Sequence, residues 1–201
     1  MNRKDIEKVN FTNFSCLIFT GTCLAAEPSR SAIFLALEKA KVTNIPIILD
    51  IDYRPYTWKS SKEASQIYLK AAKFCDILIG NDEEFGVLAK SYDKGMKIAR
   101  ELSKVVSIVI FKKGEKGSIT LFNNQKIFKG IFSVKAIKPT GAGDAFMGAF
   151  VGALLNNKSV EESIEYGSAS AAIVVTKVGC APAMPSQNEI DDFMKINKIE
   201  K

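Results

Sequence analysis

Short runs of β-branched and aromatic residues alternate with longer segments of helical pattern along the first half of the chain. The apolar runs lie at residues 14–21, 45–52 and 75–81, and the helical patterns at 27–41, 61–74, 82–90 and 93–104. An unbroken apolar run such as "IPIILDID" (45–52) is typical of a strand that is buried on both faces. The alternation therefore predicts βαβ units around a mainly parallel sheet.

The pattern changes after residue 104. Four short strands are expected at residues 105–113, 117–123, 125–130 and 132–136. Tight Gly or Asn turns join them, which is typical of antiparallel hairpins. Helices are expected at residues 144–157, 159–178 and 186–197. Because no repeat, low-complexity tract or linker divides these segments, we expect one α/β domain over residues 1–201.

Composition excludes several classes of protein. The net charge is +6, but the basic residues are scattered and are not interleaved with aromatic residues, so a nucleic-acid surface is not indicated. The sequence has no histidine, which excludes Ser-His-Asp and Cys-His hydrolases and histidine-ligated zinc. The four cysteines are far apart and form no CxxC pair, so we expect reduced thiols in a cytoplasmic protein.

The N-terminal segment "MNRKDIEKVNFTNFSC" is polar, and the sequence predicts neither a signal peptide nor a membrane span. The first apolar strand begins by residue 14, which leaves one edge of the expected sheet without evident cover. We therefore expect either another chain at that edge, as in a homo-oligomer, or residues that normally precede it in a separate N-terminal fragment.

The stretch "KPTGAGDAF" (138–146) combines two glycines and a carboxylate in one turn before a helix of small residues. A turn that leads into a helix binds anions, because unpaired N–H groups and the helix dipole both favour negative charge there. Asp144 could then accept a proton from a substrate hydroxyl. Alternatively, Gly141 and Gly143 only shape the turn and Asp144 caps the helix.

This stretch resembles the C-terminal signature of the PfkB/ribokinase family of carbohydrate kinases. The segments "IGNDEEF", "KKGEKGS" and "SASAAIVVTKVGCAPAMPS" resemble further segments of that family, in family order. The resemblance implies a ribokinase-like three-layer α/β/α fold with a mainly parallel sheet. It also implies that Gly141, Ala142 and Gly143 form an anion hole for the γ-phosphate of ATP and that Asp144 is the catalytic base.

The resemblance assigns further residues to the nucleotide and its metal. Asn81 and Glu84 would help to hold Mg²⁺ and the phosphates, largely through water, and Glu84 would be the metal-site carboxylate. Gly114, Gly117 and Lys112 would line the nucleotide site. Two alternatives stay open: helix-dipole stabilisation by Glu83 and Glu84, and an ordinary hairpin turn in which Lys112 or Lys113 is a solvated edge residue.

The segment "LDIDYRPYTW" (49–58) is similar to the strand end of family members that phosphorylate keto-sugar acids. Arg54 is expected near the sugar carboxylate or the transferred phosphate, because a guanidinium binds such groups bidentately. Asp52 is the second expected substrate-binding residue. Lys138 replaces an acid that helps to bind a monovalent cation in most of the family, so its ammonium could take the place of that cation.

The expected activity is ATP-dependent phosphorylation of a sugar or keto-sugar acid, with 5-dehydro-2-deoxygluconate as the first candidate. The family's N-terminal part, including its β-lid, has no counterpart here, so we expect the C-terminal two thirds of the fold. The alternative is a chain that binds nucleotide but does not catalyse without a separate N-terminal fragment. A dinucleotide-binding oxidoreductase is disfavoured, because no G-x-G-x-x-G motif follows the first strand.

Overall fold

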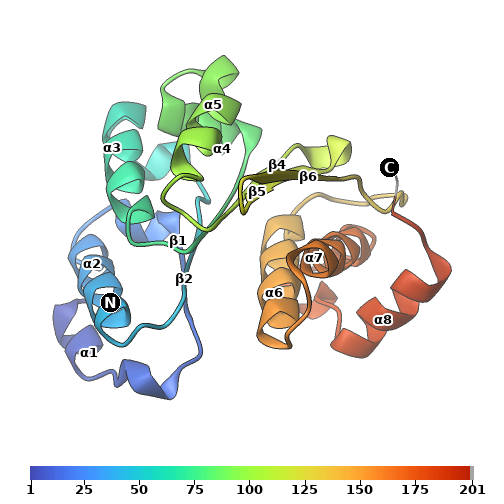
Figure 1. Ribbon diagram of the computed structural model, residues 1–201, viewed down its shortest axis with the longest axis horizontal. Coiled ribbons are helices and arrows are strands. Elements are labelled where there is room, and N and C mark those ends of the chain that lie inside the picture. The colour runs from blue at the N-terminus through green and yellow to red at the C-terminus, as the bar shows by residue number, and fades with distance from the viewer. Residues whose placement is uncertain (200–201) are drawn as a thin grey trace. The chain divides into compact units, whose positions relative to one another are not determined.

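The computed structural model describes residues 1–199, and strands and helices alternate over the first half of the chain (Figure 1). The strands are β1 (Leu17–Thr20), β2 (Ile47–Asp50), β3 (Ile77–Asn81), β4 (Ile108–Lys112), β5 (Ser118–Phe122) and β6 (Gln125–Lys129). The helices are α1 (Arg3–Glu7), α2 (Ser29–Val42), α3 (Ser61–Ala72), α4 (Asp82–Ala89), α5 (Gly95–Leu102), α6 (Ala142–Leu155), α7 (Val160–Val175) and α8 (Gln187–Ile196).

The six strands form one sheet in chain order, from β1 to β6. The first four strands are parallel, which confirms the predicted mainly parallel sheet. The two residues between β5 and β6 are Asn123 and Asn124, with φ of 49° and 60°. A connection of two residues with positive φ is typical of a hairpin and joins antiparallel strands. The predicted hairpin at this position is therefore confirmed.

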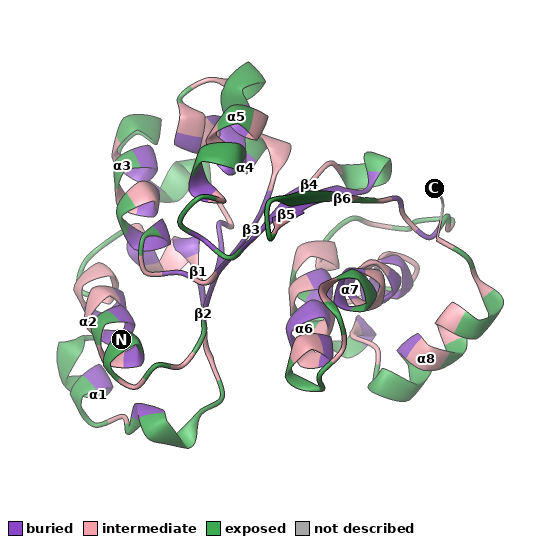
Figure 2. Ribbon diagram, viewed as in Figure 1, coloured by how far each residue is buried: buried purple, intermediate pink, exposed green. Residues whose placement is uncertain are grey.

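Burial follows the position of each strand in the sheet (Figure 2). All four residues of β2 are buried, as are the first four of β3 and of β4. Strands covered on both faces read as continuous apolar runs, which explains why "IILD", "ILIG" and "IVIF" show no alternation. By contrast, β6 has the sequence "QKIFK" and is mostly exposed.

Helix starts follow from capping residues. Asn81, Ser159 and Ser186 each precede a helix, and each accepts a hydrogen bond from the N–H of a glutamate three residues later. That glutamate in turn accepts from the N–H of the capping residue, so each helix has a complete capping box. Asn2 and Asp5 form the same arrangement at α1.

The described chain divides into two compact units. The first comprises Met1–Lys113 and Ile119–Lys126, and the second comprises Gly114–Ser118 and 127–199. In the first unit, buried side chains of α2, α3, α4 and β1–β4 form one hydrophobic core. In the second unit, α7 and α8 pack around Phe132 and Ile190. This division into two units does not test the single domain expected over residues 1–201, which stays a prediction.

One predicted strand is wrong. Residues 132–136 alternate as Phe-Ser-Val-Lys-Ala, but they form only an isolated bridge between Phe132 and Ile199. The backbone that follows pairs with the end of a helix instead, since the N–H groups of Ile137 and Lys138 both donate to the Val175 carbonyl of α7. An alternating sequence without a neighbouring strand cannot form a ladder, so the segment remains irregular.

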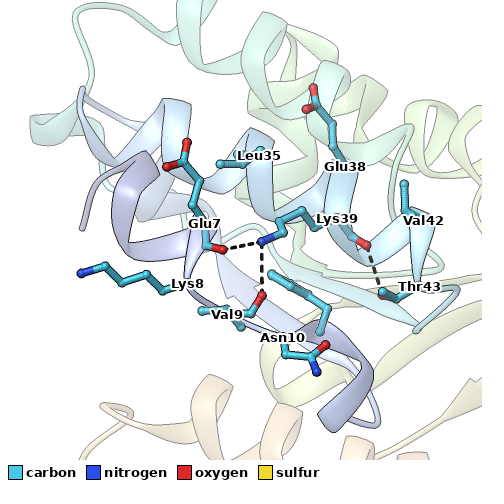
Figure 3. Close-up of a pocket in the computed structure, with 10 residues that line it drawn as sticks. Glu7, Lys8, Val9, Asn10, Leu35, Glu38, Lys39, Val42 and Thr43 are labelled. Carbon is cyan, nitrogen blue, oxygen red and sulfur yellow. Dashed lines mark hydrogen bonds between the residues drawn. The ribbon is translucent and has the colours of Figure 1, made fainter.

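The N-terminal segment is held on α2 by Lys39. Its ammonium donates to the backbone carbonyls of Ile6, Glu7 and Val9 at 3.1, 3.0 and 3.2 Å, and two of these bonds are drawn in Figure 3. A lysine at the last carbonyls of a helix also interacts favourably with the helix dipole. The groove beside Lys39 contains none of the site residues expected from the sequence. Among residues 1–199, no helix is long and apolar enough to cross a membrane.

Candidate active site

The start of α6 requires a glycine at position 141. Gly141 is the N-cap residue and has a φ of +89°, a region that residues with a Cβ rarely adopt. A Cβ at this position would lie 2.8 Å from the Cys180 sulfur and 3.3 Å from Cγ1 of Val174. Both the conformation and the available space therefore disfavour larger residues at position 141.

The N–H groups of this turn are partly unpaired. The Ala142 N–H donates to the Pro139 carbonyl at 3.3 Å, and the Ala145 N–H donates to the Gly141 carbonyl at 2.9 Å. The N–H groups of Gly143 and Asp144 have no acceptor in the described part of the chain. Unpaired donors at a helix start, where the dipole is positive, favour an anion. The local geometry therefore suits the anion hole expected from the sequence.

Asp144 lies in the first turn of α6, and its side chain is exposed. It makes no hydrogen bond or ion pair to any residue within 1–199, and α6 has no side-chain cap. The alternative in which Asp144 caps the helix is therefore wrong. The carboxylate remains available to a ligand that approaches the turn.

Lys138 reaches the same turn from the preceding segment. Its Nζ donates to the Thr140 carbonyl at 3.3 Å, one residue before Gly141. The lysine thus places a fixed positive charge beside the backbone that leads into α6.

The predicted substrate residues lie beyond β2, at the carboxyl edge of the parallel strands. Asp52 has a φ of +39°, which is strained for a residue with a Cβ. Its carboxylate forms an ion pair with Arg54, at 2.6 Å between Oδ1 and the guanidinium nitrogen, and accepts a hydrogen bond from the Thr22 hydroxyl at 3.2 Å. Half of the Arg54 side chain is exposed, so the guanidinium can still contact a ligand.

Asn81 and Glu84 form the capping box of α4. The Glu84 N–H donates to the Asn81 side chain at 2.9 Å, and the Asn81 N–H donates to Oε2 of Glu84 at 2.7 Å. The other oxygen, Oε1, accepts from the Tyr53 N–H at 3.2 Å. Burial raises the pKa of Glu84, partly offset by the Asn81 N–H and by the nearby Lys112 ammonium.

This arrangement bears on the expected magnesium site. Each carboxylate oxygen of Glu84 already accepts a backbone hydrogen bond, and the residue is 6% exposed. Within residues 1–199, no three His, Cys, Asp or Glu side chains lie close enough together to hold a metal. Both oxygens of Glu84 thus make backbone contacts, and its expected role, holding Mg²⁺ largely through water, stays a prediction.

The expected nucleotide segment is a turn between β4 and β5. Gly114 and Gly117 have φ of +57° and +74°, and the Gly117 N–H donates to the Gly114 carbonyl at 3.1 Å. A Cβ at Gly117 would lie 2.1 Å from the Lys129 carbonyl oxygen, whereas a Cβ at Gly114 would meet open space. Gly117 is therefore explained by packing, and Gly114 is free for close approach of a ligand. Lys112 ends β4.

The predicted residues fall into two groups, one in each unit. The first unit contains Asp52, Arg54, Asn81, Glu84 and Lys112, and the second contains Gly114, Gly117, Gly141, Ala142, Gly143 and Asp144. In the first group, the hydrogen bond from Tyr53 to Glu84 links the 52–54 turn to the start of α4.

Sequence reasoning missed two residues of the first group. Thr22 holds Asp52, and Asp50 is a carboxylate, 5% exposed, whose charge contributes to raising the pKa of Glu84. Asp50 could have been found as the acid that ends an apolar buried strand. Thr22 could have been found from the Thr-x-Thr pattern at the end of β1: Thr20 ends the strand, and its hydroxyl is hydrogen-bonded to that of Thr22 at 2.7 Å.

Known proteins resemble most of this chain. A family model described as pfkB family carbohydrate kinase matches residues 2–187. The 5-dehydro-2-deoxygluconokinase of Geobacillus thermodenitrificans (strain NG80-2) is 36% identical over 196 residues, which cover 95% of this chain and 58% of that protein. The chain thus spans a little more than half the length of this curated relative.

Solved structures share the fold. A ribokinase from Thermotoga maritima is 30% identical with a TM-score of 0.73, and the match covers 94% of this chain and 61% of that one. A fructokinase double mutant from Vibrio cholerae O395, solved with fructose, ADP and a potassium ion, has a TM-score of 0.81 at 22% identity. That match covers 92% of this chain and 64% of the fructokinase. The expected ribokinase-like α/β fold is therefore confirmed.

Proposed function

This chain belongs to the pfkB family of carbohydrate kinases, and we propose that it phosphorylates a hydroxyl group of a sugar acid with ATP. The observation that carries the proposal is Asp144, an exposed carboxylate without a partner in residues 1–199, beside two unpaired N–H groups. Phosphoryl transfer needs stabilised phosphate charge and a base at the attacking hydroxyl, and this turn offers both.

In the proposed reaction, the N–H groups of Gly143 and Asp144 hold the transferred phosphoryl group. The Asp144 carboxylate takes the proton of the substrate hydroxyl as the hydroxyl oxygen attacks the γ-phosphorus of ATP; the bond from that phosphorus to the β–γ bridging oxygen breaks, and ADP leaves. Glycine at 141 lets the backbone approach the phosphate, because no side chain covers the turn. Gly114, Gly117 and Lys112 belong to the proposed nucleotide side, together with Asn81. Mg²⁺ keeps several waters and would enter with the phosphates of ATP.

The proposed substrate class is a keto-sugar acid, and 5-dehydro-2-deoxygluconate is the first candidate. The name of the Geobacillus relative, at 36% identity, supports this choice. Arg54 supports it as well, since an exposed guanidinium held by Asp52 can bind a carboxylate bidentately. We include a cytoplasmic location in this proposal, because ATP and such sugar acids are found there.

An assay of ADP formation tests the proposal. The purified chain is given ATP, Mg²⁺ and either 5-dehydro-2-deoxygluconate or a neutral sugar such as fructose or ribose. We expect turnover with the acid and a kcat/KM at least about tenfold lower with the neutral sugars, since these lack the carboxylate for Arg54. Binding of ATP without turnover of any sugar would contradict the kinase proposal and favour a chain that only binds nucleotide.

A further inference from the structure

We infer that Glu84 is a positioning residue for the turn that carries Asp52 and Arg54. Its carboxylate joins two segments, since one oxygen accepts the N–H of Asn81 and the other accepts the N–H of Tyr53. The inference rests on the proposed function, in which Arg54 contacts the sugar acid. It gives Glu84 a role in sugar affinity in addition to the largely water-mediated role toward Mg²⁺ that the family resemblance implies.

The 52–54 turn needs support from outside itself. Asp52 has a φ of +39°, and a residue with a Cβ holds such a conformation only where its surroundings impose it. Two contacts support this conformation, one to the Asp52 side chain and one to the backbone of the next residue. The Thr22 hydroxyl binds the Asp52 carboxylate, and Glu84 binds the N–H of the next residue, Tyr53.

Glu84 is well placed to hold the turn firmly. It lies on α4, whose start is fixed by the capping box, and it is 6% exposed. Hydrogen bonds from N–H groups to a buried carboxylate are stronger than bonds between neutral groups. The Lys112 ammonium lies near enough to favour the charged form, although burial and the Asp50 charge act against it.

Arg54 depends on this support. Its guanidinium is oriented by Asp52, at 2.6 Å, and Asp52 is oriented by the backbone of the turn. If the Tyr53 N–H lost its acceptor, the turn could relax from its strained conformation and carry Asp52 and Arg54 with it. Small displacements of a group that positions substrate have large effects on its contribution.

The variant Glu84→Asp separates the tether from the helix cap. An aspartate at the same helix position is long enough to complete a capping box, as Asp5 does at α1, where it accepts the Asn2 N–H at 2.8 Å. The shorter side chain lacks the reach to bind Tyr53 as well. Glu83→Asp is the matched control, because Glu83 is the preceding residue of α4 and is exposed.

Two measurements decide the inference. We expect Glu84→Asp to speed hydrogen exchange of the Tyr53 amide at least about tenfold. We also expect it to raise KM for the sugar acid about tenfold while KM for ATP and the Mg²⁺ requirement change less than about twofold. Glu83→Asp should leave all of these values unchanged.

The inference is overturned if Tyr53 exchanges as in the wild type, or if the variant changes the Mg²⁺ requirement and leaves KM for the sugar acid unaltered. Failure of the proposed function is a separate outcome. If the wild-type chain phosphorylates no sugar acid, the exchange of the Tyr53 amide alone decides whether Glu84 holds the turn.

Discussion

The starts of α4 and α6 carry an acid at the same helix position but use it differently. At α4, Glu84 is buried and both its oxygens accept backbone N–H groups. At α6, Asp144 is exposed and binds no described residue. The difference follows from the capping residue. Asn81 supplies an acceptor and an ordinary extended backbone, whereas Gly141 has no side chain and a φ of +89°.

The comparison extends to three other helices. Asp5, Glu162 and Glu189 lie at the same position in α1, α7 and α8, and each completes a capping box. In α1, α4, α7 and α8, the side chain of this acid accepts a hydrogen bond from the N–H of its own capping residue. Helix α6 lacks such a cap, which is usually worth about 1 kcal/mol, and keeps its carboxylate and N–H groups open. The unsatisfied start of α6 is the feature that supports the proposed site there.

The largest expected effect is on catalysis at α6. Asp144→Asn should lower kcat by about 10²- to 10⁴-fold, because an amide cannot accept the proton of the substrate hydroxyl. The free energy of unfolding should fall by no more than about 1 kcal/mol, since Asp144 has no partner in the described chain and only the helix dipole favours its charge. Steady-state kinetics and urea denaturation check both values. Asp192→Asn on α8 is the control, and an Asp144→Asn enzyme with more than about a tenth of wild-type kcat would show that Asp144 is not the base.

The next effect is on the α6 turn itself. Gly141→Ala should destabilise the protein by about 1–3 kcal/mol, because alanine is strained at this φ and its Cβ would meet the Cys180 sulfur. Gly148→Ala is the matched control in the same helix, where a Cβ meets nothing within 4 Å. That control should stabilise the protein by about 0.5–1 kcal/mol. Equal results for the two variants, measured by denaturation, would contradict the role given to Gly141.

A smaller effect is expected at the α4 cap. Asn81→Ala should cost about 1 kcal/mol of unfolding free energy, because the Glu84 N–H loses its acceptor. Ser159→Ala, which breaks the corresponding box of α7, should cost a similar amount. Both values come from urea denaturation at neutral pH. A loss at Ser159 without one at Asn81 would mean that the Tyr53 contact alone fixes Glu84.

The smallest expected effect is on the pH dependence of the unfolding free energy, which should differ between a buried and an exposed capping acid. Burial raises the pKa of Glu84 above its ordinary value of 4.5, so its contribution to stability is greatest below pH 4.5 and is lost as pH rises through the raised pKa. The Ser186 N–H and the Lys177 ammonium lower the pKa of Glu189 to about 2, so its contribution is present above pH 4.5 and is lost as pH falls toward 2.

Denaturation of Glu84→Gln and Glu189→Gln across this pH range measures the two contributions. The difference between wild type and variant should fall with rising pH for Glu84 and rise with pH for Glu189. Two differences with the same sign of slope would contradict the contrast between a buried and an exposed cap.

Much of the fold was predictable because its signals are local. The apolar runs that became β2, β3 and β4 and the capping residues before the helices need no tertiary information. The same signals misled at residues 132–136, where alternation was present but no partner strand was available. The N–H groups of Ile137 and Lys138 instead donate to the Val175 carbonyl, a contact that depends on tertiary structure and not on the local sequence.

The candidate site was predictable in part. The glycine turn at 141–143 and Asp144 could be predicted as a candidate anion site, because such a site requires only backbone N–H groups and a helix that follows them. The strained φ of Asp52 and its contacts with Thr22 and Arg54 could not be predicted, because they depend on tertiary structure and no hydrophobic periodicity in the sequence indicates them. The Asn-x-x-Glu pattern at 81–84 is also the pattern of a capping box, and the structure supports that interpretation of Glu84.

The bond from Lys138 to the Thr140 carbonyl has a consequence for the ionic environment of the α6 turn. A dissolved cation at that carbonyl would obey a binding isotherm and would dissociate on dilution. A side chain attached by covalent bonds does not dissociate from the protein on dilution. Each molecule therefore carries one amino group beside this turn whatever the concentration of dissolved cations, and acylation of the lysine would remove its charge.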